Sequence, residues 1–178
     1  MIFLNEIETK IIDIDVDAFR KKILKLGAKK IFDGMTRSKA FKLGDRLLRL
    51  RDFGSRVELT YKGPAIKSKY KVREEINLKL DNYDAAASIL ESIGFKDSVS
   101  FNKHRESYVM EIKNIEFHLD IDDFGVMPKF IEIETKTEEE LRDILDYFGI
   151  GDKNLFSGSL NDLIARYGVK ESDVYTDS

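Results

Sequence analysis

The chain has 178 residues, of which 42% are hydrophobic and 35% charged, so it can bury one well-packed domain or two small ones and lacks the composition of a disordered protein. A formal net charge of −3 argues against a general nucleic-acid or membrane-surface binder, and the absence of cysteine excludes disulfides and thiolate-bound metal sites. The longest apolar runs are too short to cross a bilayer and no signal-peptide pattern is present, so we expect a cytoplasmic protein.

The first predicted strand contains the sequence NEIETK at positions 5–10, in which charged and uncharged residues alternate. Successive side chains of a strand point to opposite faces, so Glu6, Glu8 and Lys10 should share one face of a sheet. Two carboxylates this close repel each other unless a cation lies between them. The strand therefore predicts a charged site on one face.

The next elements follow in chain order. A helix capped by Asp15 or Asp17 should end at about Gly27, and residues 29–53 should form short strands around turns at 33–34 and 44–45. The remaining expected elements are strands over 56–62 and 69–80, a helix over 82–93, strands over 97–112, 115–122 and 129–136, a helix from 137 to about 148, and a short helix after Ser159. No Pro- or Ser-rich linker divides the chain, so we expect a single domain over residues 1–169 and a disordered tail over 170–178.

Later strands repeat the separation of charged from apolar faces. The residues of the charged faces are Arg49, Arg51, Glu58, Thr60, Lys62, Lys71, Arg73, Glu75, Lys103, Arg105, Asp120, Asp122, Glu132 and Glu134. A sheet with one solvated face would explain any one of these strands. Such a face would intersperse the two signs, whereas here acidic pairs occur near both ends of the chain and basic pairs in the middle.

If the sheet closes into a barrel, the charged faces line its lumen. Carboxylates are hard oxygen ligands suited to Mg²⁺ or Mn²⁺, arginine offers a planar fork that matches phosphate oxygens, and lysine adds a point charge. Together they describe a site for a metal-bound polyphosphate. The sequence contains no G-x-x-x-x-G-K-[ST] loop, so side chains would have to hold the phosphates.

The sequence EIETK at 6–10 resembles the E-x-E-x-K signature of the CYTH superfamily, the triphosphate tunnel metalloenzymes. This superfamily includes CyaB-type class IV adenylate cyclases, thiamine triphosphatases and inorganic triphosphatases. Further matches occur in order at 48–51, 59–64, 73–75, 103–105, 119–120 and 130–134, so the resemblance extends from Glu6 to about Leu163. The layout, with LTYKGP at 59–64, is most similar to the CyaB-type branch.

The resemblance implies an α+β fold, an eight-stranded antiparallel β tunnel (a closed barrel) with helices packed outside. It also implies that the tunnel binds a triphosphate together with Mg²⁺ or Mn²⁺. The implied metal ligands are Glu6, Glu8, Asp120, Glu132 and Glu134. The implied triphosphate-binding residues are Lys10, Arg49, Arg51, Lys62, Arg73, Lys103 and Arg105, and the implied catalytic set is Glu6, Glu8, Lys10 and Glu134.

The function implied first is that of a metal-dependent adenylate cyclase, which converts ATP to cyclic AMP and pyrophosphate. The alternatives are an inorganic or thiamine triphosphatase, a non-catalytic nucleotide- or polyphosphate-binding protein, and an α+β domain whose charged sheet face is merely solvated. No stretch indicates an adenine pocket, and the aromatic residues fit the core or the strand faces better than a base-stacking platform. Neither nucleic acid nor membrane is expected as a partner, and a homodimer is compatible with the resemblance.

Four positions, in three motifs, depart from the family pattern. Ser38 and Ala40 stand where an Asp and a Tyr often precede the residue matched by Phe41. Asn77 replaces a Glu that often follows R-x-E, and Leu160 replaces the Tyr of a C-terminal Ser-Tyr motif. These departures concern the end of the substrate that carries no phosphate.

Overall fold

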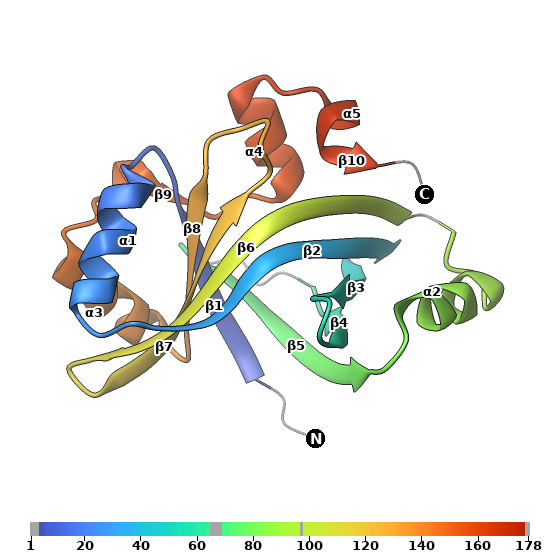
Figure 1. The fold of residues 1–178 in the computed structure, drawn as a ribbon, viewed down its shortest axis with the longest axis horizontal. Helices are drawn as coiled ribbons and strands as arrows, with labels where there is room; N and C mark the ends of the chain where they lie inside the picture. Colours follow the sequence, from blue (N-terminus) through green and yellow to red (C-terminus); the bar gives the residue numbers. More distant parts are fainter. Residues whose placement is uncertain (1–3, 65–68, 97, 177–178) are drawn as a thin grey trace.

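The computed structural model describes residues 4–64, 69–96 and 98–176 (Figure 1). Its main strands are β1 (Leu4–Ile11), β2 (Lys29–Leu43), β3 (Arg46–Asp52), β4 (Val57–Lys62), β5 (Lys71–Leu80), β6 (Ser98–Ile112), β7 (Ile115–Asp123) and β8 (Phe130–Thr135). They form an antiparallel ring in the order β1-β5-β4-β3-β2-β6-β7-β8, which closes because β8 pairs with β1. The predicted α+β fold with a closed antiparallel sheet is confirmed.

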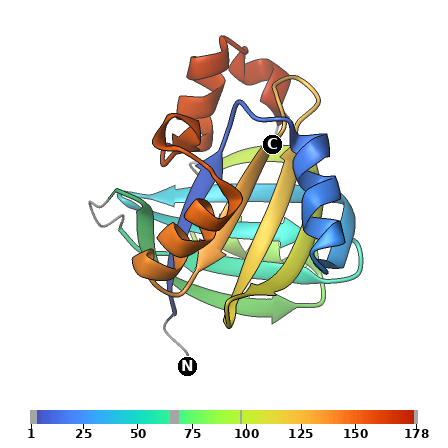
Figure 2. The same cartoon turned by 90° about the vertical axis from the view of Figure 1, so that its left-hand side faces the viewer.

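Helices cover the outside of this ring (Figures 1 and 2). In the described part of the chain they are α1 (Val16–Lys25), α2 (Tyr83–Ser92), α3 (Glu138–Phe148), α4 (Leu160–Tyr167) and α5 (Glu171–Val174), with the short elements η1 (Asp152–Asn154), β9 (Leu155–Phe156) and β10 (Tyr175–Thr176). Asp15 caps α1 by accepting a hydrogen bond from the backbone N–H of Ala18 at 2.9 Å, and Thr137 and Glu140 form the predicted capping box of α3. None of these helices is long and apolar enough to span a membrane.

The apolar core lies between the ring and its helices. The largest cluster packs α1 and α3 against β1, β6, β7 and β8, and it includes Phe19, Tyr108 and Phe148. A second cluster packs α2 against β2, β3 and β4 around Phe41, and a third packs α4 and α5 around Phe130. Most of the core therefore lies outside the ring, which leaves the inner faces of the strands largely free for polar residues.

A turn at residues 33–34 was expected, and this prediction is wrong. β2 continues through Asp33 and Gly34 and pairs with β6 from Lys29 to Phe41, with one register shift between Lys30 and Phe32. An Asp-Gly turn needs a positive φ, and Gly34 does not adopt one. The long partner strand β6 outweighs the local turn preference.

The C-terminal residues also differ from expectation. Residues 171–176 form α5 and β10 instead of a disordered tail, and β10 pairs with β6 through Tyr175 and Thr176. Val174 is buried in the cluster around Phe130, and this apolar contact anchors a segment whose other residues are polar. The segment lies over the end of β6 beyond its pairing with β7 (Figure 1).

Candidate active site

The lumen of the ring contains two adjoining pockets. The wide pocket has a volume of about 630 Å³ and the narrow pocket one of about 290 Å³. Both are lined by Glu8, Arg49, Arg51, Lys62 and Glu132, so the two pockets meet at a shared belt of charged side chains.

Strand alternation brings the predicted site residues to these pockets. On β8, Ile131 and Ile133 are fully buried in the core, whereas Glu132 and Glu134 face the lumen. Every predicted site residue whose side chain is described lines at least one pocket: Glu8, Lys10, Arg49, Arg51, Lys62, Arg73, Lys103, Arg105, Asp120, Glu132 and Glu134. Glu6 lies in β1 opposite Arg73, and its side chain is outside the described part.

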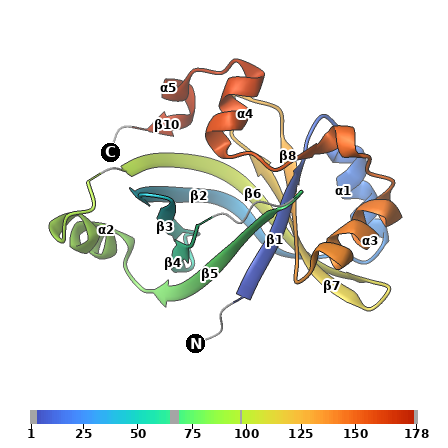
Figure 3. The same ribbon diagram turned by 180° about the vertical axis from the view of Figure 1, so that it is seen from behind.

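Four of the carboxylates stand in directly opposed pairs on neighbouring strands. β1 lies between β5 and β8 (Figure 3), and Glu8 of β1 is the register partner of Glu134 of β8. Asp120 of β7 is likewise the partner of Glu132. Like charges placed directly across a sheet repel each other, so this arrangement needs cations within the lumen.

Lysines and arginines of the lumen supply those cations. Lys71 forms an ion pair with Glu8, and the Nζ of Lys10 lies 3.2 Å from Oε1 of Glu132. Arg105 pairs with Asp120 and donates to Oε2 of Glu132 at 2.8 Å. These pairs connect β1, β5, β6, β7 and β8 across one side of the tunnel.

The ion pairs decide the charge state of the carboxylates. Burial by itself would raise the pKa of Glu8, but the cations Lys71 and Lys62 outweigh it and hold that pKa at about 2. Burial is opposed in the same way at Glu132, whose pKa is held well below its usual range by Lys10 and Lys103. Both carboxylates are therefore ionised at neutral pH and can act as oxygen ligands without first losing a proton.

Two further acidic residues organise the cations. Asp122 is fully buried and accepts two hydrogen bonds from Arg105, at 2.7 Å and 2.6 Å, while it also pairs with Lys103. Glu75 is buried beside Lys62 and forms an ion pair with it. The alternating pattern puts both carboxylates on the charged face, and β7 extends to Asp123, one residue beyond the expected strand over 115–122.

The positive charge of the lumen is only partly balanced. Burial and the neighbouring Arg49 and Arg105 lower the pKa of Arg51 well below its usual value. The buried Nε of Arg73 has no hydrogen-bond partner among the described residues. Buried cations that repel each other and a donor without an acceptor are the features that a bound polyanion would relieve.

The residues that depart from the family pattern also face the lumen. Ser38 is fully buried, and its Oγ accepts a hydrogen bond from Nε of Arg51 at 3.2 Å. Ala40 lines the wide pocket opposite Arg49, and Asn77 accepts a hydrogen bond from Thr60 at 2.7 Å. The small side chains of β2 leave space beside the arginines of β3.

The acidic residues fit a hard divalent cation by donor type. Glu8, Glu134, Asp120 and Glu132 offer carboxylate oxygens on three adjacent strands, as Mg²⁺ and Mn²⁺ require. Within the described residues no three acidic or histidine side chains converge as a ready-made metal site, since lysines and arginines attract the carboxylates individually. Glu8, Asp120 and Glu132 would have to leave these internal ion pairs to hold such a cation.

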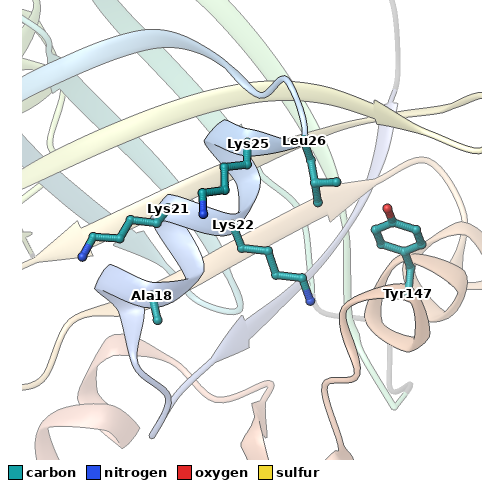
Figure 4. A pocket seen from close by; sticks show the side chains of 6 residues that line it. All are labelled: Ala18, Lys21, Lys22, Lys25, Leu26 and Tyr147. Atoms are coloured by element: carbon teal, nitrogen blue, oxygen red, sulfur yellow. The ribbon is translucent and has the colours of Figure 1, made fainter.

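A separate pocket of about 570 Å³ lies outside the ring, between α1 and the end of α3 (Figure 4). It is lined by Ala18, Lys21, Lys22, Lys25, Leu26 and Tyr147. It contains none of the predicted site residues and no carboxylate, so it is not part of the predicted site.

Comparison with known proteins agrees with this geometry. The model of the CYTH domain family matches residues 4–159. The chain belongs to the CYTH family. A candidate adenylate cyclase of Methanocaldococcus jannaschii is 31% identical in an alignment 176 residues long that covers 89% of this chain and 97% of that protein.

Solved structures share the CYTH fold at lower identity. A candidate adenylate cyclase from Vibrio parahaemolyticus has a TM-score of 0.75 at 17% identity, covering 92% of this chain and 99% of the other. A candidate adenylyl cyclase from Hippeastrum, described as having a dominant triphosphatase activity, has a TM-score of 0.61 at 16% identity, covering 97% and 99%. The PH1012 protein of Pyrococcus horikoshii has a TM-score of 0.69 at 21% identity, covering 89% and 98%.

Proposed function

We propose that this CYTH protein is a divalent-metal-dependent enzyme that acts on a triphosphate inside its tunnel, first of all as an adenylate cyclase that converts ATP to cyclic AMP and pyrophosphate. The observation that carries the proposal is the meeting of opposed carboxylates and partly unbalanced cations at one belt of the lumen, around Glu8, Arg51 and Glu132. The 31% identity to the candidate cyclase of M. jannaschii supports the same assignment.

The chain's own cations would bind and orient the triphosphate. Arg49, Arg51 and Arg73 present guanidinium groups from β3 and β5, and Lys62 and Lys103 add ammonium groups from β4 and β6. Because these groups are fixed by strands and largely shielded from water, they stabilise charge on the leaving polyphosphate without reorganising during the reaction.

The proposed metal ligands are Glu6, Glu8, Asp120, Glu132 and Glu134. A bound Mg²⁺ or Mn²⁺ would supply Lewis-acid polarisation of phosphoryl oxygens. The chain's contribution is to keep the carboxylates ionised, as the low pKa of Glu8 indicates, and to hold them on adjacent strands. Lys10 and Arg105 hold Glu132 in place between them.

The same cradle serves two reactions that differ in the position of the substrate. A cyclase brings the ribose 3′-oxygen to the α-phosphorus and releases pyrophosphate, whereas a triphosphatase brings water to the terminal phosphorus. The second reaction is our alternative, with inorganic or thiamine triphosphate as substrates, because the Hippeastrum protein of the same fold is described as a dominant triphosphatase. A non-catalytic nucleotide- or polyphosphate-binding protein would have little need for paired lumen carboxylates.

A product assay on the purified protein tests the proposal, with ATP and separately inorganic triphosphate, each with Mg²⁺ or Mn²⁺. We expect cyclic AMP and pyrophosphate from ATP. Release of phosphate from triphosphate without any cyclic product would support the triphosphatase alternative. Ligand-dependent thermal stabilisation without turnover of either substrate would overturn the enzyme proposal in favour of a binding protein.

A further inference from the structure

The two pockets of the tunnel differ in the residues that line them. The wide pocket is lined in part by a cluster of four rings, Phe101, Phe124, Phe130 and Tyr175, which we call the aromatic wall. Successive ring centroids along it are 6.2 Å apart from Phe130 to Phe124, 6.0 Å from Phe124 to Phe101, and 6.2 Å from Phe101 to Tyr175. These rings come from β6, the loop between β7 and β8, the start of β8, and β10, so separate parts of the chain form one surface.

The four rings differ in solvent exposure: two are buried and two are partly exposed. Phe101 and Phe130 are only 8% and 2% exposed. Phe124 and Tyr175 line the same pocket but are only half-buried. Phe124 and Phe130 are nearly parallel, with an interplanar angle of 18°, so the buried ring of Phe130 packs against the more exposed ring of Phe124. Half-open aromatic faces in a concave site favour a flat apolar ligand group.

The C-terminal segment holds Tyr175 in position. Tyr175 and Thr176 pair with Phe101 and Ser100 of β6, and the Tyr175 hydroxyl donates a hydrogen bond to Oδ1 of Asn161 on α4. Val174, one residue earlier, is buried in the core cluster of α4. The ring is therefore fixed at its backbone and at its hydroxyl before any ligand arrives.

The aromatic wall adjoins the cations that we propose bind the phosphates. The Nζ of Lys103 lies 5.5 Å from the ring centroid of Phe124, and Lys103 lines the wide pocket together with Arg49 and Arg51. A triphosphate held by these cations would direct any group attached to it toward the wall. Inorganic triphosphate carries no such group and could not use this surface.

The family match separates the aromatic wall into a part inside the matched region and a part after it. It ends at residue 159, so α4, α5 and β10 lie beyond it. Phe101, Phe124 and Phe130 lie inside the matched region, whereas Tyr175 and its partner Asn161 lie outside. The segment after the match therefore completes a surface that the matched region only begins.

We propose that the C-terminal segment, through Tyr175, is a specificity element that selects triphosphates bearing a planar ring over inorganic triphosphate. This inference rests on the proposed function, since it needs a triphosphate in the tunnel. It replaces the expectation that the aromatic residues do not form a stacking platform. The sequence pattern did not indicate such a platform, because its four rings come from separate segments of the chain.

The test compares the binding of ATP, of ribose 5-triphosphate (ATP without its base) and of inorganic triphosphate by calorimetry, with Ca²⁺ replacing Mg²⁺ to slow turnover. Tyr175→Ala should weaken ATP binding roughly tenfold or more, as expected for the loss of one stacking ring, and leave the other two ligands within about twofold. Tyr175→Phe keeps the ring and should retain most of the ATP affinity. Tyr167→Ala is the matched control, because Tyr167 lies on the same segment, bonds Asp13, and does not line the pocket.

Three other outcomes would contradict the proposed role of Tyr175. An equal loss for all three ligands in Tyr175→Ala would mean that the segment only supports the tunnel, and unchanged ATP affinity would mean that the base lies elsewhere. Either result overturns the specificity role and leaves the proposed function intact. If the wild-type protein binds none of the three ligands and turns over neither ATP nor inorganic triphosphate, the proposed function fails and this inference fails with it.

Discussion

The lumen and the outer faces of the same strands have opposite chemistry. On β8, Ile131 and Ile133 pack under the helices, while Glu132 and Glu134 point into the tunnel. Small barrels commonly fill their interior with side chains that pack together, but here two of the three apolar clusters lie outside the ring, and the third, around Phe130, includes residues that line the wide pocket. Stability and the proposed chemistry are therefore carried by opposite faces of the same strands, and a substitution on one face should leave the property carried by the other largely unchanged.

This separation has a cost within the lumen. Burial and two neighbouring arginines lower the pKa of Arg51, which means that the folded, ligand-free protein disfavours the charge it carries there. A bound polyanion would remove this repulsion, so the tunnel should be a region that the ligand stabilises and not one that stabilises the fold by itself. The outer clusters must supply the free energy that keeps the charged lumen assembled.

The largest expected effect on the lumen face is that of Glu134→Gln on turnover. The substitution keeps the size of a proposed metal ligand and removes its charge, so kcat should fall roughly a thousandfold while the melting temperature changes little. Initial rates and thermal melts of the same preparation check both expectations. Glu116→Gln, an exposed carboxylate at the β6–β7 hairpin, is the matched control, and a Glu134→Gln enzyme that keeps its activity would contradict the metal assignment.

The adjacent residue on the same strand should give the reverse result. Ile133→Ala removes a fully buried side chain from the cluster under α3 and should lower the free energy of unfolding by about 2–5 kcal/mol. Activity per folded molecule should stay within about twofold, because Ile133 does not line either lumen pocket. Chemical denaturation and titrated active-site rates measure the two quantities. Loss of activity in the folded fraction would show that the two faces are not independent.

Much of this division could be predicted from the sequence because a strand has a period of two. Alternation alone assigned Glu132 and Glu134 to one face and Ile131 and Ile133 to the other, and the structure places them so. Features that depend on contacts between distant segments could not be read in this way. The continuation of β2 through Asp33 is set by its long partner β6, and the anchoring of Tyr175 is set by Asn161 and by Phe101.

The arrangement of the carboxylates could not be predicted from the sequence for a different reason. The pattern identified oxygen donors of the right type, but it contained no information about which cation each carboxylate would meet in the ligand-free tunnel. Lys71 pairs with Glu8 and Arg105 pairs with Asp120, and these choices follow from strand register. The roles assigned to the individual lumen residues stay predictions that substitution must test.

The smallest expected effect concerns the lumen cation nearest the aromatic wall. Burial and the neighbouring Arg105 lower the pKa of Lys103 to about 7, although Asp122 opposes them. Because this pKa lies below the ordinary value, the free amine replaces the ammonium group as the pH rises through about 7. A bound triphosphate favours the ammonium form, so its affinity should be greatest below this pH. The affinity should weaken by up to about tenfold per pH unit above it until the pKa of the complex is reached.

Calorimetric titration of inorganic triphosphate between about pH 6 and about pH 9 measures this dependence. Lys103→Arg keeps a permanent charge and should bind with a flatter pH profile, while Lys103→Gln should bind more weakly at low pH and show the same flat profile. The last ionisation of triphosphate itself is common to all three proteins, so the difference between profiles isolates the lysine. Parallel profiles for the wild type and Lys103→Arg would mean that Asp122 keeps the lysine charged throughout. The repulsion from Arg105 would then be too weak to count, and the lumen would be better balanced than its buried arginines indicate.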